Sequence, residues 1–242
     1  MLGSLSLALL GFLLGVRHAI DPDHVVAVTA IATQQLSQQL SQQLSQQPPL
    51  QRSQQPPQQP NWRRATLIGA LWGIGHTVTV MSVGGAIVLF RVAISPRVGL
   101  AFEFAVAIML ILLGVMNLLG SRATLPAAPR TTPSHARPLV VGMMHGLAGS
   151  AAIALLVLAT VSDSRWALAY LLLFGVGTVV GMMLVTTLIA LPATLASPHV
   201  VGMRRWLTVA SGAVSVVLGL MLARELSGPG GLFSAAPQWI PR

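Results

Sequence analysis

Residues 15–28 read GVRHAIDPDHVVAV and place two histidines, His18 and His24, and two aspartates, Asp21 and Asp23, in a stretch that otherwise reads as membrane-spanning. An ionised side chain near the centre of a membrane-spanning helix costs about 2.5–3.5 kcal/mol on insertion scales. Four ionisable groups within seven residues therefore need a partner. A metal cation satisfies all of them at once.

The same stretch predicts a broken helix. Pro22 has no backbone N–H, and it disfavours the α conformation at Asp21. We expect Asp21 to cap a second helical segment whose first residue is Pro22. In a continuous helix His18 and His24 would point about 120° apart, so the break allows them to converge.

The composition is that of an integral membrane protein. Over 242 residues the chain is 54% hydrophobic and 8% charged. All 14 basic residues are arginines, and most lie between apolar runs, which indicates membrane topology rather than nucleic-acid binding. The absence of cysteine excludes thiolate metal sites and disulfides. We expect an all-α, multi-pass protein of the cell (inner or plasma) membrane.

Apolar windows predict about six membrane-spanning helices. They lie at 4–32, 65–90, 100–120, 138–160, 167–192 and 206–223. The predicted organisation is 1–33, a broken first helix with the metal motif; 34–61, a disordered Gln/Pro-rich linker; 62–120, helices two and three; 121–137, a flexible loop; 138–224, helices four to six; and 225–242, a tail. The linker has no apolar face to offset the entropy of ordering it.

The two halves of the chain align with each other. Residues 15–20 (GVRHAI) align with 142–147 (GMMHGL), 71–78 (LWGIGHTV) with 173–180 (LFGVGTVV), and 113–116 (LGVM) with 218–221 (LGLM). Three spans in each half give the halves opposite orientations in the membrane. This arrangement predicts the inverted repeat of secondary transporters, whose sites lie near the membrane midplane at discontinuous helices.

The candidate metal ligands are histidines and aspartates. They are His18, Asp21, Asp23, His24, His76 and His145. Nitrogen and carboxylate donors suit nickel(II), cobalt(II) or zinc(II) better than magnesium or calcium. The alternative is an Asp-Pro turn whose histidines bond to carbonyl groups, with His76 and His145 as buried histidines bonded across helices.

Residues 17–25 (RHAIDPDHV) closely resemble the R-H-A-(V/F)-D-A-D-H-I signature of the nickel/cobalt transporter (NiCoT/NicO-like) family. Residues 75–77 (GHT) are similar to its G-H-S-T-V-V block. The resemblance implies that His18, Asp23 and His24 recognise the metal and that His76 belongs to the pathway.

The uptake branch of that family carries acidic L-G-x-D-T-A-T-E and G-M-x-x-x-D-T-x-D blocks. Here the corresponding residues read HGLAGS at 145–150 and GMMLVT at 181–186. The chain is therefore most similar to the short nickel-permease-like or urease-accessory members.

These patterns favour transport of nickel or cobalt as substrate, with no enzymatic activity and no other cofactor. The expected partners are the lipid bilayer, the divalent metal ion and metalloenzyme maturation proteins. A G-x-x-x-x-G-K-[ST] motif is absent from the sequence, so this chain does not itself use ATP. Two alternatives stay open: an accessory protein that delivers nickel to an enzyme such as urease, and a membrane acyltransferase that uses His18 and Asp23.

Overall fold

The computed structural model describes residues 2–46, 62–90, 95–122, 135–147, 161, 163–195 and 201–239. Within these ranges the chain forms seven α-helices and no β-strand. The helices are α1 (Leu2–His18), α2 (Pro22–Gln46), α4 (Trp62–Phe90), α5 (Pro96–Arg122), α6 (Ala136–Gly146), α8 (Ser164–Leu195) and α9 (Val201–Leu226).

Four of these helices, α4, α5, α8 and α9, are long and apolar enough to cross a membrane, and α1 contains a shorter apolar segment, Ser6–His18. Many of their large apolar side chains are exposed, among them Leu119, Leu188 and Leu220, which are 61%, 65% and 54% exposed. An apolar outer surface suits a lipid environment. The chain is a helical membrane protein.

The six-span count stays a prediction. The first predicted span consists of two helices, α1 and α2. Of the fourth, 138–160, the structure describes α6 and Leu147, and residues 148–160 lie outside the described residues.

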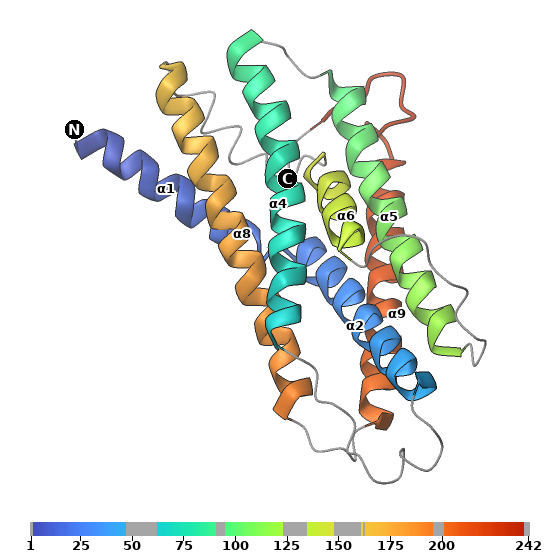
Figure 1. Cartoon of the computed structure of the whole chain (residues 1–242). Helices are drawn as coiled ribbons and strands as arrows, with labels where there is room; N and C mark the ends of the chain where they lie inside the picture. The colour runs from blue at the N-terminus through green and yellow to red at the C-terminus, as the bar shows by residue number, and fades with distance from the viewer. Residues whose placement is uncertain are drawn as a thin grey trace.

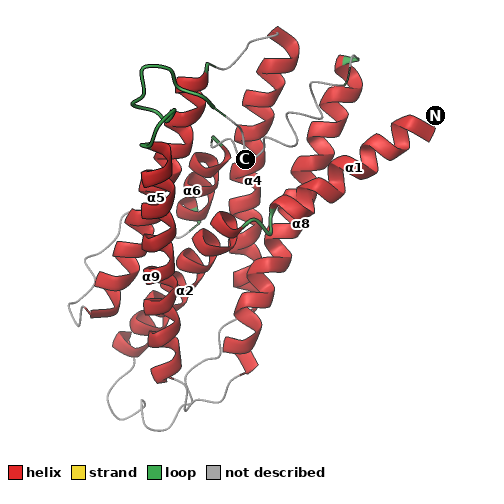
Figure 2. Cartoon of the chain, turned by 180° about the vertical axis from the view of Figure 1, so that it is seen from behind, coloured by secondary structure: helices red, strands yellow, loops and turns green. Residues whose placement is uncertain are grey.

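The helices pack in two groups. In the first group, α8 lies along α4 and α1, and α6 lies along α4; in the second, α5 lies along α9, and α2 contacts both (Figure 1). Seen from behind, α1 crosses α8 while α2 runs beside α9 (Figure 2). The chain passes from the first group to the second at the break between α1 and α2.

The break lies where the sequence predicts it. The N–H groups of Ile20 and Asp21 donate to the carbonyl groups of Arg17 and His18, which closes α1 with a tight turn. The N–H of Val25 then donates to the Asp21 carbonyl, and α2 starts at Pro22. Proline suits the first position of a helix because the N–H that it lacks would have no partner there.

The disordered linker is predicted to start at residue 34, but the structure is helical beyond that point. Helix α2 continues to Gln46, so residues 34–46 are helical, whereas 47–61 lie outside the described residues. Glutamine and leucine are good helix formers, and extending an existing helix needs no new nucleus. The helix ends two residues before Pro48, the first proline of the segment.

The predicted flexible loop 121–137 lies mostly outside the described residues. Helix α5 reaches Arg122, α6 starts at Ala136, and residues 123–134 between them are not described.

The predicted tail is anchored on the second group. After α9 the chain turns back, and the Trp239 indole N–H donates to a carboxylate oxygen of Glu103 in α5 at 2.8 Å. The rings of Phe233 and Phe104 meet edge to face with their centroids 5.8 Å apart. The C-terminal segment therefore packs against the N-terminal half of α5.

Equivalent positions in the aligned halves make equivalent contacts. A Cβ at Gly15 in α1 would collide with the carbonyl oxygen of Phe174 in α8, and one at Gly142 in α6 would collide with that of Trp72 in α4. Gly15 aligns with Gly142, and Phe174 aligns with Trp72. The short helices α1 and α6 therefore approach α8 and α4 in the same way.

The approach of α1 to α8 predicts a stability effect. Gly15→Ala forces the two backbones apart, and we expect the free energy of unfolding to fall by about 1–3 kcal/mol. Gly85→Ala in α4 is the control, because a Cβ there has no neighbouring atom within 4 Å among the described residues. Thermal unfolding of the purified variants measures both, and equal unfolding midpoints would contradict the close approach.

Candidate metal centre

Four histidines meet at the break between α1 and α2. His18 is the last residue of α1, His24 lies in the first turn of α2, His76 in the middle of α4 and His145 near the end of α6. His18 is 5% exposed and the other three are 0% exposed. Three helices of the first group and one of the second thus supply imidazoles to one buried place.

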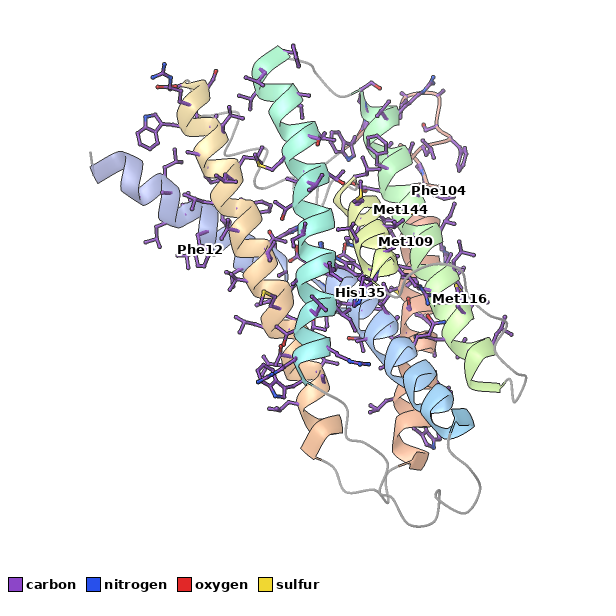
Figure 3. All side chains as sticks on the ribbon, in the orientation of Figure 1. Phe12, Phe104, Met109, Met116, His135 and Met144 are labelled. Carbon is purple, nitrogen blue, oxygen red and sulfur yellow. The ribbon has the colours of Figure 1, made fainter. Side chains whose placement is uncertain are left out.

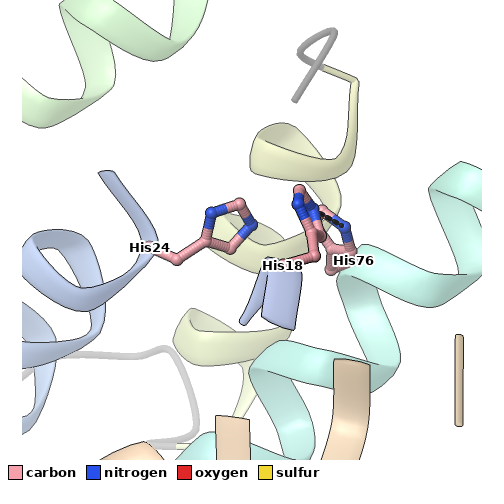
Figure 4. A group of neighbouring side chains, drawn as sticks. All are labelled: His18, His24 and His76. Carbon is pink, nitrogen blue, oxygen red and sulfur yellow. Dashed lines mark hydrogen bonds between the residues drawn. The ribbon is translucent and has the colours of Figure 1, made fainter. Parts of the chain in front are cut away.

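His18, His24 and His76 form the three-histidine group, in which one ligand nitrogen from each residue lies within 4.8 Å of the others. The Nε2 atoms of His18 and His76 are 3.2 Å apart (Figure 4). Two nitrogens bound to one metal ion at about 2.0–2.1 Å lie roughly 2.9–3.4 Å apart. The observed separation therefore matches that of two ligands of one ion.

Asp23, His24 and His145 form the carboxylate group, whose ligand atoms also lie within 4.8 Å of one another. Asp23 bridges the two rings: Oδ1 is 3.1 Å from His24 Nδ1, and Oδ2 is 3.0 Å from His145 Nε2. His24 belongs to both groups, and its ring centroid lies 4.4 Å from that of His18 and 4.2 Å from that of His145.

Asp21, also predicted as a ligand, lies outside both groups. Its Oδ2 is 2.9 Å from His18 Nδ1, and its side chain is 41% exposed. A carboxylate that holds the second ring nitrogen of a histidine fixes the ring's orientation and its tautomer. The geometry therefore suits Asp21 to orienting His18.

Several buried ring nitrogens of the site have no hydrogen-bond partner among the described residues. They are His24 Nε2, His76 Nδ1 and His145 Nδ1. Buried polar atoms are normally paired, because leaving one unpaired costs free energy. Unpaired imidazole nitrogens beside a carboxylate are the donor set of a transition-metal ion, so the residues present fit a metal.

The helix ends add a field that favours a cation. Helices α1 and α6 end at His18 and Gly146, so the C-terminal ends of both helices lie next to the histidines. A helix C-terminus carries roughly half a negative charge. The N-terminus of α2 carries the positive end of its helix dipole, and the Asp23 carboxylate in its first turn offsets that positive charge.

Over 249 aligned residues the chain is 34% identical to the protein named urease accessory protein UreH of Bacillus sp. (strain TB-90), and the alignment covers 98% of this chain and 97% of that protein. The chain belongs to the UreH family. No protein-family model matches it, and no solved structure matches it. The relative's name describes an accessory protein, not an enzyme, and membership of the UreH family supports the expected similarity to urease-accessory members.

In this UreH-family chain two aromatic side chains line the histidines. The Phe174 ring lies 5.3 Å from the His18 ring, and the Trp72 ring lies 5.6 Å from the His145 ring, measured between centroids. Sequence reasoning did not single out either aromatic residue. The signal was present, because Trp72 aligns with Phe174 and His145 aligns with His18.

The positions of His135 and Asp23 in the UreH-family chain bear on two alternatives: a further histidine ligand and the acyltransferase site. His135 is exposed at the start of α6, at the opposite end of that helix from His145 (Figure 3). The carboxylate of Asp23 contacts His24 and His145, whereas the His18 ring contacts Asp21 and His76. An acyltransferase needs an aspartate that orients the catalytic histidine, and these contacts do not pair Asp23 with His18.

Proposed function

We propose that the chain is a permease that moves a divalent transition-metal ion, nickel(II) or cobalt(II), across the cell membrane. The observation that carries this proposal is the convergence of four buried histidines and Asp23 at a helix break. Buried ionisable groups in a membrane protein mark ion pathways. Nickel and cobalt suit this mixture of imidazole and carboxylate donors.

The two overlapping ligand groups give the ion a short path. An ion held by His18, His24 and His76 passes to Asp23, His24 and His145, and His24 contributes a ligand to both groups. Each state then supplies three protein ligands, so the ion is never left without partners in the apolar interior. The second state adds the Asp23 charge, which stabilises a dication more strongly than imidazoles do.

The aligned halves support an inverted repeat with alternating access. The contacts of α1 with α8 match those of α6 with α4, and α1 and α6 both end at the metal centre. In inverted-repeat transporters one bundle rocks against another around a fixed site. We assign the two bundles that rock against each other to the first and second groups of helices.

The membrane potential is sufficient to drive uptake. Moving one elementary charge down a membrane potential of 100 mV releases about 2.3 kcal/mol of free energy, so moving a dication down the same potential releases about 4.6 kcal/mol. That free energy supports a concentration ratio of roughly a thousandfold or more. A nucleotide site in this chain is therefore unnecessary.

Uptake of radioactive nickel by proteoliposomes with an interior-negative potential tests the proposal. We expect the purified chain to accumulate nickel, and we expect His76→Ala to reduce the initial rate by about tenfold or more. His135→Ala is the matched control, because that histidine is exposed and lies outside both ligand groups.

The relative's name supports a second function, delivery of metal to an enzyme such as urease without transport. The same experiment separates the two functions. Nickel binding by the purified chain without movement into the proteoliposomes would reject the permease and leave the accessory role.

A further inference from the structure

A second polar cluster lies in the second group of helices, away from the histidines. It consists of Thr33, Gln34, Asn117, Thr208 and Ser211 on α2, α5 and α9, and is called here the amide cluster. Asn117 is 1% exposed, and Gln34 and Thr208 are each 6% exposed. The metal centre uses none of these residues.

Hydrogen bonds join the three helices at this cluster. The Asn117 amide nitrogen donates to the Ala30 carbonyl at 2.9 Å and lies 3.5 Å from the Ser211 hydroxyl. The Ser211 hydroxyl is 3.2 Å from that of Thr33 and donates to the Thr208 carbonyl at 3.0 Å. Backbone and side-chain oxygens therefore crowd around the Asn117 amide.

Two amide oxygens of the cluster are buried without a partner among the described residues, Asn117 Oδ1 and Gln34 Oε1. Gln34 lies one helical turn beyond Ala30, on the face of α2 that Asn117 meets. Burying an amide oxygen without a hydrogen-bond partner is unfavourable. Two such oxygens, one on α2 and one on the neighbouring α5, indicate a missing electropositive partner.

Packing alone does not require these polar residues. In the register that aligns 113–116 with 218–221, Asn117 corresponds to Leu222 and Ser211 corresponds to Val106. The aligned positions on the same pair of helices thus hold apolar side chains.

We propose that the amide cluster binds a small monovalent cation, sodium. Its donors are hydroxyl, amide and backbone oxygens, which hard cations prefer. None of its five side chains is ionisable, so the site offers dipoles but no negative charge. Neutral dipoles suit a single charge, because the cost of removing water from an ion rises steeply with its charge.

Helix α2 connects this site to the metal centre. His24 and Thr33 are nine residues apart on that one helix, which is about 14 Å along its axis. A cation that fixes α2 against α5 and α9 therefore also fixes the helix that carries Asp23 and His24. Coupling of sodium to nickel movement rests on the proposed function, whereas sodium binding itself does not.

Equilibrium binding of radioactive sodium to the purified full-length chain, without nickel, tests the proposal. We expect saturable binding in the wild type and an affinity lower by about tenfold or more in Asn117→Leu, which introduces the residue type of the aligned position. Thr66→Val is the matched control: it also removes a hydroxyl pair between helices, Thr66 with Thr187 at 2.7 Å, but outside the cluster.

Ser211→Ala is the second variant and decides the outcome if Asn117→Leu does not fold, as judged by its elution on size exclusion. Loss of sodium affinity in the cluster variant and not in Thr66→Val supports the site. Absence of saturable sodium binding in the wild type, or equal affinity in the cluster and control variants, overturns it and assigns the cluster a bound water. Because no nickel is present, failure of this test leaves the nickel permease untouched.

Discussion

His24→Ala is expected to abolish tight binding of nickel to the purified chain. His24 is the one residue common to the three-histidine group and the carboxylate group, so its loss removes a ligand from both. Loss of an outer-shell partner alone typically lowers metal affinity by about 10–100-fold, and loss of this shared ligand should exceed the upper value. Isothermal titration with nickel measures the change.

The comparison variants for this prediction are His18→Ala and His145→Ala. Each removes a ligand from only one group, so each leaves the other group intact. We therefore expect both to bind nickel more tightly than His24→Ala does. An affinity of His24→Ala equal to that of His135→Ala would show that the ion does not bind at the break.

Asp23→Asn is expected to have the second largest effect. The Asp23 carboxylate contacts His24 and His145 at once, and it is the only carboxylate in either ligand group among the described residues. The amide keeps nearly the same size but has no charge, and one of its ends donates where a carboxylate accepts. We expect nickel affinity to fall by about 100-fold or more.

Asp21→Asn is the matched control because the same substitution is made two residues earlier. Asp21 contacts only His18 among the histidines and is 41% exposed, so the effect should be near the lower end of the outer-shell range, about tenfold. A larger loss in Asp21→Asn than in Asp23→Asn would reverse the roles given to the two aspartates.

The helix break was predictable because it depends on local sequence. Pro22 fixes the start of α2, and the cluster of ionisable residues around it demands a partner wherever the rest of the chain lies. The repeat alignment also pairs His145 with His18, and in the structure both rings lie against the ring of His24.

Other features depend on contacts that no local pattern encodes. Asp21 and Asp23 are equally plausible ligands in the sequence, and only the path of the turn decides which one faces His145. The amide cluster joins residues 33, 117 and 211, whose meeting requires the packing of α2 against α5 and α9. The helical extension to Gln46 was not predicted, because the repetitive polar composition of residues 34–46 indicates disorder although glutamine and leucine favour a helix.

The crossing of the chain between the two helix groups has a mechanical consequence. Only Ala19, Ile20 and Asp21 connect α1 to α2, and the ligands lie directly at this connection. When two rigid bodies rotate about a short joint, points near the pivot are displaced least and distant points are displaced most. In the proposed permease the ligand atoms would therefore move least when the two helix groups rotate, and the far ends of the helices would move most.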